Sequence, residues 1–450
     1  MRVSVVGTGY VGLVSGVGLS EIGHEVICVD IDQAKVDLIN KGVTPIFEDG
    51  LEELLAQNVG VRLRATTDLR AAVEGSDLTL VAVGTPFDGE HIDLRYVREA
   101  VRQIGEALRD KTAYHVVVVK STVVPGTTTQ VVLPVLEEAS GKRAGADFGV
   151  GMNPEFLAEG AAVADFMTPD RIVLGGIDAR TQDALAELYG PFDGATMLRT
   201  DPTTAEMIKY TANSLLATMI SFSNEIGNLC ADVGVDAVEA MAGVHLDKRL
   251  SPVMADGSRV TPGFLSFLAA GCGFGGSCFP KDVKALVAFG RQHDNPMPIL
   301  DAVISTNNAQ PSRMLNLLRA HVADLAGARI AVLGMAFKPG TDDIRESPSL
   351  PVTQALVDAG AIVTAYDPIA RETAEAHFGD RVRFSDDLEQ ATAEVDAILI
   401  MTRWRHFERL PALLAERGQT CAVIDGRRLL PKNSVPRYAG IGLPGGTTAG

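Results

Sequence analysis

The chain has 450 residues, more than a single hydrophobic core supports, so two or three domains are expected. Its formal net charge of −17, with no block rich in lysine or arginine, argues against nucleic acid and anionic membranes as partners. The hydrophobic content of 46% is that of a globular protein, and no apolar run reaches the length that spans a bilayer.

The cysteines and histidines point to a reducing environment and to no metal centre. Five cysteines are scattered along the chain, which fits the cytoplasm better than a disulfide framework. None of the eight histidines stands at a spacing typical of metal ligands, and no CxxC pair occurs. A strand that begins at residue 2 leaves no room for a cleaved signal peptide. We therefore expect a cytoplasmic protein without a metal ion.

The N-terminus contains a dinucleotide-binding fingerprint in its full context. An apolar strand at 2–6 leads into Gly7-Thr-Gly9-Tyr-Val-Gly12, an apolar helix and a second strand that ends at Asp30. Gly7 serves the tight turn, Gly9 lets pyrophosphate approach the backbone, and Gly12 lets the helix pack on the strand. Asp30 can accept a hydrogen bond from a ribose 2′-hydroxyl and would repel a 2′-phosphate, so the pattern predicts NAD rather than NADP. The alternative is an ordinary strand–helix turn with chance glycines.

Strand-like runs alternate with helical stretches in both halves of the chain. They lie at 2–6, 25–30, 78–83, 115–120, 147–151 and 171–175, and again at 329–334, 362–367, 395–401 and 421–425. A helix is expected near 349–358, and the stretch Gly440 to Gly450 is expected to be frayed. The fold class predicted is α/β, with two Rossmann-like doubly wound domains joined by a central long-helix segment.

The central segment differs from both halves. Residues 203–231 contain no proline and no strand signal, which predicts one long helix, and helical sequence continues to about Pro311. Such a helix between two α/β domains suits a spine and a dimer surface, so we expect a homodimer. The predicted domains are 1–198 for NAD binding, 199–312 for dimerisation and the cysteine loop, and 313–450 for a second nucleotide, because the turn after residue 334 lacks the GxGxxG pattern.

The run Gly271-Cys-Gly-Phe-Gly-Gly-Ser-Cys-Phe-Pro-Lys-Asp282 is a candidate nucleophile loop. Its glycines permit backbone conformations closed to other residues, and a ligand could approach the backbone closely. Lys281 favours the thiolate of Cys278, which is the nucleophilic form. The alternative is a glycine-rich loop with a small buried cysteine.

Two further sets of polar residues could serve this thiol. Glu155 and Glu159 stand four positions apart, on one face if this turn is helical, and carboxylates near a thiol can act as a base or hold a water. Glu206, Lys209 and Asn213 share a helix face among apolar neighbours, so Lys209 and Asn213 could donate to an oxyanion. The alternative for that face is a solvated Glu–Lys pair.

Thr85 and Thr122 each follow a strand, at the sheet edge where open α/β sheets bind ligands. Either threonine could equally be an ordinary turn residue.

Together these motifs resemble the UDP-glucose 6-dehydrogenase family, within the wider nucleotide-sugar 6-dehydrogenases. The resemblance spans nearly the whole chain and includes Val83-Gly-Thr-Pro86, Lys120-Ser-Thr122, Met152 to Gly160, Glu206 to Tyr210, Gly275 to Asp282, Ala336-Phe-Lys-Pro339, Asp342 to Ser347 and Asp425-Gly-Arg427. It implies an NAD domain, a central dimerisation segment and a UDP-binding domain. The implied reaction oxidises UDP-glucose to UDP-glucuronate by two hydride transfers to NAD.

The resemblance also implies residue roles. Cys278 resembles the nucleophile that holds the aldehyde as a thiohemiacetal and then as a thioester. Lys209 and Asn213 resemble the pair that stabilises the oxyanion. The groups that handle water and protons are matched by Thr122, Glu155 and Asp282. The implied NAD contacts are Gly7, Gly9, Tyr10, Val11, Gly12, Asp30, Lys35, Thr85, Thr122, Glu159, Lys281 and Arg345. The implied substrate contacts are Glu155, Phe156, Leu157, Lys209, Asn213, Arg249, Phe267, Leu268, Ala269, Ala270, Gly271, Gly275, Lys338 and Arg427.

The chain departs from the family pattern at three places. The family often lends an arginine to the substrate site across the dimer, and Arg249 is the nearest match. An insertion at 251–262 puts this match in question, and Arg259 is the alternative candidate. Arg403 replaces the usual glutamate before Trp404, and Glu48-Asp-Gly50 replaces Glu-Pro-Gly, a change expected to affect a loop and not the chemistry.

Three other functions remain as alternatives. One is a sister enzyme that acts on GDP-mannose or a UDP-N-acetylhexosamine. A non-catalytic nucleotide-sugar sensor is the second, and a one-step alcohol dehydrogenase of the 6-phosphogluconate type is the third. Neither the second nor the third explains both the cysteine loop and the second nucleotide domain.

Overall fold

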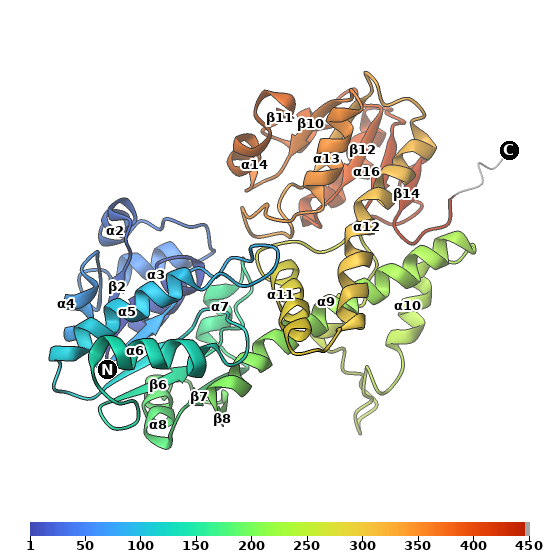
Figure 1. Cartoon of the computed structure of the whole chain (residues 1–450). Helices are drawn as coiled ribbons and strands as arrows, with labels where there is room; N and C mark the ends of the chain where they lie inside the picture. Colours follow the sequence, from blue (N-terminus) through green and yellow to red (C-terminus); the bar gives the residue numbers. More distant parts are fainter. Residues whose placement is uncertain (446–450) are drawn as a thin grey trace. The chain divides into compact units, whose positions relative to one another are not determined.

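The computed structural model describes residues 1–445, and its packing divides the chain into two compact units, Met1–Ala212 and Asn213–Gly450. The division falls inside helix α9 (Pro202–Asp232), which confirms the long helix predicted for 203–231. Each unit contains one sheet, and Figure 1 labels the elements in chain order.

The sheet of the first unit has the strand order of a doubly wound dinucleotide-binding fold. The order is β3-β2-β1-β4-β5-β6-β7-β8, with every pair parallel except β6 and β7. Ligands bind such sheets at the carboxyl ends of the strands, where the order reverses between β1 and β4. The strands are β1 (Arg2–Val6), β2 (Glu25–Val29), β3 (Leu63–Thr66), β4 (Leu78–Val81), β5 (His115–Val119), β6 (Phe148–Met152), β7 (Arg171–Gly176) and β8 (Thr196–Thr200).

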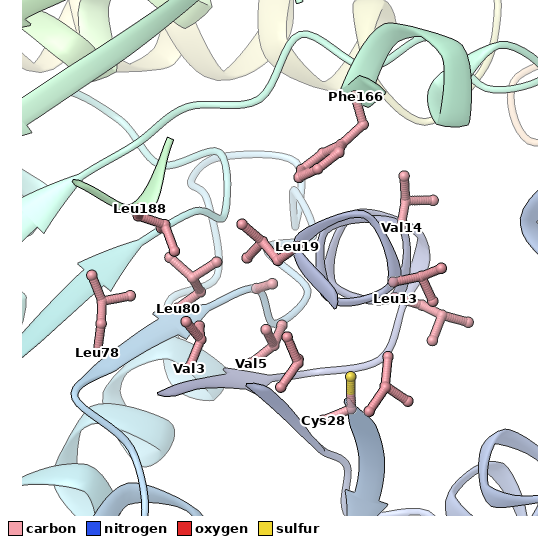
Figure 2. Close-up of a cluster of buried hydrophobic side chains, with 14 of the residues drawn as sticks. Val3, Val5, Leu13, Val14, Leu19, Cys28, Leu78, Leu80, Phe166 and Leu188 are labelled. Atoms are coloured by element: carbon pink, nitrogen blue, oxygen red, sulfur yellow. The ribbon is translucent and has the colours of Figure 1, made fainter. Parts of the chain in front are cut away.

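Two apolar cores lie on the two faces of this sheet. Figure 2 shows the first, in which Val3 and Val5 of β1 pack near Leu13 of α1 and Phe166 of α7. The helices that contribute to this core are α1 (Tyr10–Glu21), α2 (Gln33–Asn40), α3 (Leu51–Asn58), α7 (Ala162–Met167) and α8 (Ala179–Leu188). The opposite core is built by α4 (Leu69–Glu74), α5 (Arg95–Asp110) and α6 (Leu133–Ser140), which follows the short π-helix η1 (Thr128–Val132).

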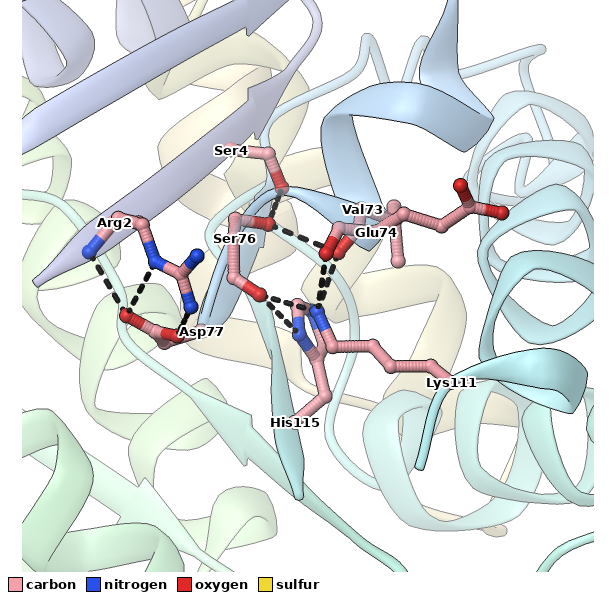
Figure 3. A network of polar contacts seen from close by, with 8 residues as sticks. All are labelled: Arg2, Ser4, Val73, Glu74, Ser76, Asp77, Lys111 and His115. Carbon is pink, nitrogen blue, oxygen red and sulfur yellow. Dashed lines mark hydrogen bonds and ion pairs between the residues drawn. The ribbon is translucent and has the colours of Figure 1, made fainter. Parts of the chain in front are cut away.

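A polar network holds the amino ends of β1, β4 and β5, away from the ligand edge (Figure 3). The fully buried His115 lies 2.8 Å from the hydroxyl of Thr79 and 3.2 Å from the carbonyl of Ser76. Burial, followed by the nearby Lys111, lowers the pKa of His115 to about 3. Lys111 donates to the carbonyls of Val73 and Glu74 at the end of α4. His115 is therefore a neutral structural residue at neutral pH.

The second unit starts with helices and continues with a second doubly wound sheet. The helices after α9 are α10 (Ala237–His245), the 3-10 turn η2 (Gly263–Phe267), α11 (Phe279–Gln292) and α12 (Pro298–His321). We expected the helical sequence to end near Pro311, but α12 runs through this proline to His321. Its buried residues Met314 and Leu318 pack in the core of the second sheet, which outweighs the loss of one helical hydrogen bond.

The second sheet repeats the strand order of the first. Its order is β11-β10-β9-β12-β13-β14, and all of its pairs are parallel. The strands are β9 (Arg329–Leu333), β10 (Ile362–Tyr366), β11 (Arg383–Phe384), β12 (Ala397–Ile400), β13 (Ala422–Asp425) and β14 (Tyr438–Gly440). The helices are α13 (Ser349–Asp358), which confirms the helix expected at 349–358, α14 (Arg371–Phe378), α15 (Leu388–Ala391), α16 (Leu410–Glu416) and the 3-10 turns η3 (Gly379–Arg381) and η4 (Arg405–Arg409).

The expectation that the chain is frayed from Gly440 is wrong for the residues that the structure describes. Ile441 is 2% exposed and packs in the core of the second sheet, and the carbonyl of Gly442 accepts the backbone N–H of Ala237. Residues 446–450 lie outside the described part of the chain. Within residues 1–445, no helix is long and apolar enough to cross a membrane.

Candidate functional site

The glycine turn of the first unit is shaped to admit a pyrophosphate. Gly7 has φ +98°, and a Cβ there would lie 2.7 Å from the carbonyl oxygen of Ala82. A Cβ on Gly12 would lie 1.8 Å from the carbonyl oxygen of Gly7, whereas one on Gly9 would meet nothing within 4 Å. Gly9 also precedes the first turn of α1, where backbone N–H groups and the helix dipole favour anions. The turn therefore fits a dinucleotide in the way that the fingerprint predicts.

Asp30 is held beside this turn as a carboxylate. Its Oδ2 accepts the backbone N–H of Thr8 at 2.9 Å and the Thr8 hydroxyl at 2.6 Å, and its Oδ1 accepts the N–H of Asp32 at 3.1 Å. Burial raises the pKa of Asp30, but these hydrogen bonds outweigh it and leave the pKa below its ordinary value. The ionised acid can accept from a ribose hydroxyl and would repel a 2′-phosphate.

The strand ends beside the turn carry the two predicted threonines. The hydroxyl of Thr85, after β4, donates to the carbonyl of Thr122, after β5, at 2.8 Å. This bond joins two neighbouring strand ends at the edge where such sheets bind ligands. Lys35 lies on α2, whose N-cap is Asp32.

A buried ion pair joins Glu155 to Lys209. Oε1 of Glu155 lies 2.8 Å from Nζ of Lys209, and the two side chains are 5% and 4% exposed. Oε2 of Glu155 accepts the N–H of Leu157 at 2.7 Å, and the ring of Phe156 lies 5.6 Å from the Lys209 ammonium. Burial raises the pKa of Glu155, but attraction to Lys209 and these hydrogen bonds lower it below its ordinary value. Glu155 is therefore ionised at neutral pH.

Glu206 is also buried, so the solvated Glu–Lys pair is excluded for this face of α9. Its carboxylate accepts the N–H groups of Gly126 at 2.5 Å and Thr128 at 2.8 Å, and the Thr128 hydroxyl at 2.6 Å. Burial raises the pKa of Glu206 to about 7 against these bonds. Glu206 thus fixes the loop that follows Thr122, and Lys209 is left to pair with Glu155.

Glu48 anchors the turn that contains Glu159. Its Oε1 and Oε2 accept the backbone N–H groups of Ala162 and Gly160, each at 2.7 Å, and it accepts a short hydrogen bond from the hydroxyl of Tyr10. Burial, aided by Glu48, raises the pKa of Tyr10. Sequence reasoning missed this role for Glu48, because these partners lie far from it along the chain.

The helical turn considered for Glu155 and Glu159 does not form. Residues 153–158 are irregular and α7 begins only at Ala162. Pro154 disfavours helical backbone at the residue before it.

The second unit holds the cysteine loop in place through its backbone. Gly273 and Gly276 have φ +102° and +85°, and a Cβ on Gly275 would lie 2.3 Å from the carbonyl oxygen of Glu346. The Gly276 N–H donates to the carbonyl of Arg345 at 2.8 Å. Three glycines are thus required by left-handed backbone or by close approach of another segment.

Cys278 follows these glycines as the N-cap residue of α11 and is half-buried. The N-terminus of a helix stabilises negative charge, which favours a thiolate. The other four cysteines are buried within the described chain. Cys272 is fully buried, and burial raises the pKa of its thiol. Cys278 is therefore the thiol most open to reagents.

A buried carboxylate follows the thiol by one turn of helix. Asp282 is 1% exposed and accepts from the Asn213 amide at 2.6 Å and from the Lys281 ammonium at 2.6 Å. The predicted set Asn213, Lys281 and Asp282 is thus brought together within this unit. Asn213 lies on α9 one helical turn after Lys209.

Two of the predicted substrate contacts in the second unit, Lys338 and Arg427, follow strands of its sheet. Arg427, after β13, donates to the carbonyls of Met401 at 2.7 Å and Gly273 at 2.9 Å. Lys338 follows β9, and the backbone N–H of Cys272, next to Gly271, donates to the carbonyl of Gly426 at 2.8 Å. Arg345 pairs with Asp343 at 2.7 Å.

The region around the insertion is exposed. Arg249 forms a short ion pair with Asp247, and its side chain is 83% exposed. Its rival Arg259 donates to the carbonyls of Leu246 and Ser251, each at 2.8 Å. Of the stretch from Phe267 to Gly271, Leu268 and Gly271 are buried.

Comparisons with known proteins cover both units. Three models of the UDP-glucose/GDP-mannose dehydrogenase family match: its NAD binding domain at residues 1–193, its central domain at 203–309 and its UDP binding domain at 331–432. The UDP-glucose 6-dehydrogenase AglM of Haloferax volcanii is 44% identical and aligns over 98% of this chain and 100% of its own. The GDP-mannose 6-dehydrogenase of Azotobacter vinelandii is 41% identical over 91% and 93%. A solved UDP-glucose dehydrogenase from Pyrobaculum islandicum is 39% identical, covers 98% of both chains and superimposes with a TM-score of 0.89.

Proposed function

The chain belongs to the UDP-glucose/GDP-mannose dehydrogenase family, and on this premise we propose that it oxidises UDP-glucose to UDP-glucuronate. The family consists of NAD-dependent nucleotide-sugar 6-dehydrogenases, and NAD is the cofactor. The observation that carries the proposal is the cysteine loop, whose backbone is fixed so that one half-buried thiol stands at the start of α11.

NAD supplies the acceptor for hydride from the sugar carbon. The chain's own part is to hold the dinucleotide at the turn of Gly7, Gly9 and Gly12, with Val11 in the first turn of α1. Asp30 selects the ribose hydroxyl. Tyr10 and Glu48 fix the turn of Glu159, Thr85 fixes Thr122, and Lys35, Lys281 and Arg345 are proposed as further contacts.

Cys278 gives the chemistry its four-electron character. After the first hydride transfer the thiol adds to the aldehyde carbon, and the carbonyl oxygen takes a proton to give a thiohemiacetal. A second hydride leaves that carbon for a second molecule of NAD, and with loss of the hydroxyl proton this gives a thioester. Water then attacks the thioester: one of its protons returns to the sulfur, and the other is lost as the carboxylate is released. The thiol retains the aldehyde between the two oxidations.

Charged groups around the reaction have separate proposed roles. Lys209 and Asn213 stabilise the oxyanion that develops when thiol or water attacks. Glu155, ionised and paired to Lys209, and Asp282, beside Asn213, hold water and accept protons, with Thr122 as a further polar contact. Substrate contacts are proposed for Phe156, Leu157, Arg249, Lys338, Arg427 and the 267–275 segment.

The substrate is tested by competition. NADH formation is followed with UDP-glucose, UDP-N-acetylmannosamine and GDP-mannose at equal concentrations, and product analysis identifies which sugar is oxidised. We expect UDP-glucose to have the highest kcat/KM. Preference for GDP-mannose is the runner-up outcome, because a GDP-mannose 6-dehydrogenase is 41% identical. If none of the three nucleotide sugars is oxidised, the remaining alternative is a non-catalytic nucleotide-sugar sensor.

We further propose a homodimer formed through α9. Leu215, Phe222 and Leu229 recur at intervals of seven, and each is more than half exposed on this helix. Apolar residues at this spacing form the seam of a helix pair, and a second copy of α9 would cover them. Light scattering should give the dimer mass, and Phe222→Glu should yield monomer. A wild-type monomer would contradict the dimer.

The functional parts are proposed as 1–198, 199–312 and 313–450, since one family model falls mainly in each. A cytoplasmic location is proposed because the five cysteines are scattered and odd in number, which fits a reducing compartment better than a disulfide framework.

A further inference from the structure

Lys120 is a buried cation that the proposed chemistry does not use. It follows β5 and is 4% exposed. Its ammonium lies 2.8 Å from Oδ1 of Asn153 and 3.4 Å from the Tyr189 hydroxyl, both of which are neutral groups. Burying a charge without a direct counter-ion costs several kcal/mol. A purely structural position would therefore be better filled by a neutral side chain.

Asn153 is fixed on every side. Its backbone N–H donates to the carbonyl of Val119 at 2.9 Å, and its amide donates to the carbonyl of Val173 at 2.8 Å. Its Oδ1 accepts from Lys120 and, at 2.5 Å, from the hydroxyl of Tyr189. The residue thus ties together the strands β5, β6 and β7.

This fixed point lies two residues before Glu155. The intervening Pro154 has a restricted φ and restricts the residue before it, so the path from Asn153 to Glu155 is stiff. The position of Asn153 therefore helps to place the backbone of Glu155, from which its carboxylate reaches Lys209.

The charge of Lys120 acts on the same carboxylate. The ionisable groups that face it are Glu155 after β6, Lys209 on α9 and the phenol of Tyr189 after α8. Lys120 also lowers the pKa of Glu155, after the larger effects of burial, of Lys209 and of the hydrogen bond from the Leu157 N–H. Burial lowers the pKa of Lys120 itself to about 8, with Glu155 opposing and Lys209 adding to the shift. The charge is thus present at neutral pH and lost in mild alkali.

We propose that Lys120 is a positioning residue for Glu155, which it acts on through Asn153 and Pro154 and through its positive charge. Two lysines then face one glutamate, which keeps Glu155 ionised. This inference rests on the proposed function, in which Glu155 holds water and accepts protons.

The test is the pH profile of kcat/KM for wild type, Lys120→Met and Lys120→Arg. In Lys120→Met the acid limb should move to higher pH by up to about one unit, because the variant removes a positive charge that lowers the pKa of Glu155 less than Lys209 does. In Lys120→Arg the acid limb should keep its wild-type position, because arginine keeps the positive charge beside Glu155.

Tyr189→Phe is the matched control, because it removes the other donor to Asn153 and leaves the charge. The acid limb of Tyr189→Phe should stay in place even if kcat falls. An unmoved acid limb in folded Lys120→Met overturns the proposal, as does a shifted acid limb in Lys120→Arg, which serves alone if the methionine variant does not fold. A shift of the acid limb in Tyr189→Phe equal to that in Lys120→Met overturns it too, since loosened packing would then explain the effect.

Wild-type turnover separates this inference from the proposed function. If wild type forms NADH from a nucleotide sugar, the variants test Lys120 alone. If wild type oxidises no nucleotide sugar, the proposed function fails. The effect of Lys120 on the pKa of Glu155 is then measured as the free energy of unfolding in urea at a series of acidic pH values. A lowered folded pKa of Glu155 adds stability that is lost as pH falls through that pKa. In Lys120→Met the loss should be smaller and should be complete at higher pH, and coincident profiles would overturn the inference.

Discussion

Gly275→Ala probes the packing of the cysteine loop. The new Cβ would lie 2.3 Å from the carbonyl oxygen of Glu346, 2.8 Å from its carbonyl carbon and 2.9 Å from Cα of Ser347. All three are backbone atoms and cannot rotate away. Carbon atoms in contact lie about 3.5 Å apart, so one of the two segments must move by about 1 Å.

The displacement should harm activity more than stability. Overpacking of this kind costs about 1–3 kcal/mol, which corresponds to about 2–4 °C in Tm per kcal/mol for a domain of this size. A misplacement of about 1 Å in a reacting group can cost about 100-fold in rate. We therefore expect a modest fall in Tm and about a 100-fold fall in kcat, since Cys278 stands three residues further on.

Two assays and one control test this expectation. NADH formation measures turnover, and mass spectrometry after iodoacetamide treatment measures alkylation of Cys278, the half-buried thiol among five. Gly243→Ala on α10 is the control, because a Cβ there meets nothing within 4 Å, and a helical alanine should stabilise by about 1 kcal/mol. Wild-type turnover and Tm in Gly275→Ala would refute the reasoning.

Three further predictions concern buried charge and cofactor choice. Lys209→Met should lower the free energy of unfolding in urea by about 3–5 kcal/mol, because it leaves the Glu155 carboxylate buried without its partner. The double variant with Glu155→Gln should recover part of this loss. If the effects of the two single substitutions simply add in the double variant, the pairing is contradicted. Because the folded pKa of His115 is lowered, the unfolded state binds more protons below about pH 6.5, so the free energy of unfolding should fall by about 2 kcal/mol by pH 5. His115→Gln should flatten this part of the stability profile. An unchanged slope in this variant would contradict the role given to His115. Asp30→Ser should raise the ratio of kcat/KM for NADP over NAD, and an unchanged ratio would remove Asp30 from cofactor selection.

Elements with a strong local signal could be predicted from the sequence. The long helix was placed within a residue of α9 at each end, because 203–231 contains no competing signal. The strands β3, β8, β11 and β14 were missed, since β8 is largely polar and partly exposed and β11 and β14 are very short. Edge strands of this kind lack the continuous apolar run of buried parallel strands.

The candidate site divides in the same way. Its glycines could be found because each motif is local, and the structure supplies their cause, such as the carbonyl of Glu346 against Gly275. The roles of Glu48 and Lys120 could not be found, because their partners lie far away along the chain. Glu48 stands in a polar loop sequence, which does not indicate that its carboxylate is buried and accepts backbone N–H groups.

The central claim is that Cys278 retains the aldehyde between two oxidations. The most direct measurement is the number of NADH molecules formed per UDP-glucose consumed, in wild type and in Cys278→Ser. Two per sugar in wild type, with loss of complete turnover in the serine variant, is the result that the proposal predicts. One per sugar, or a serine variant with wild-type turnover, would contradict it and remove Cys278 from the mechanism.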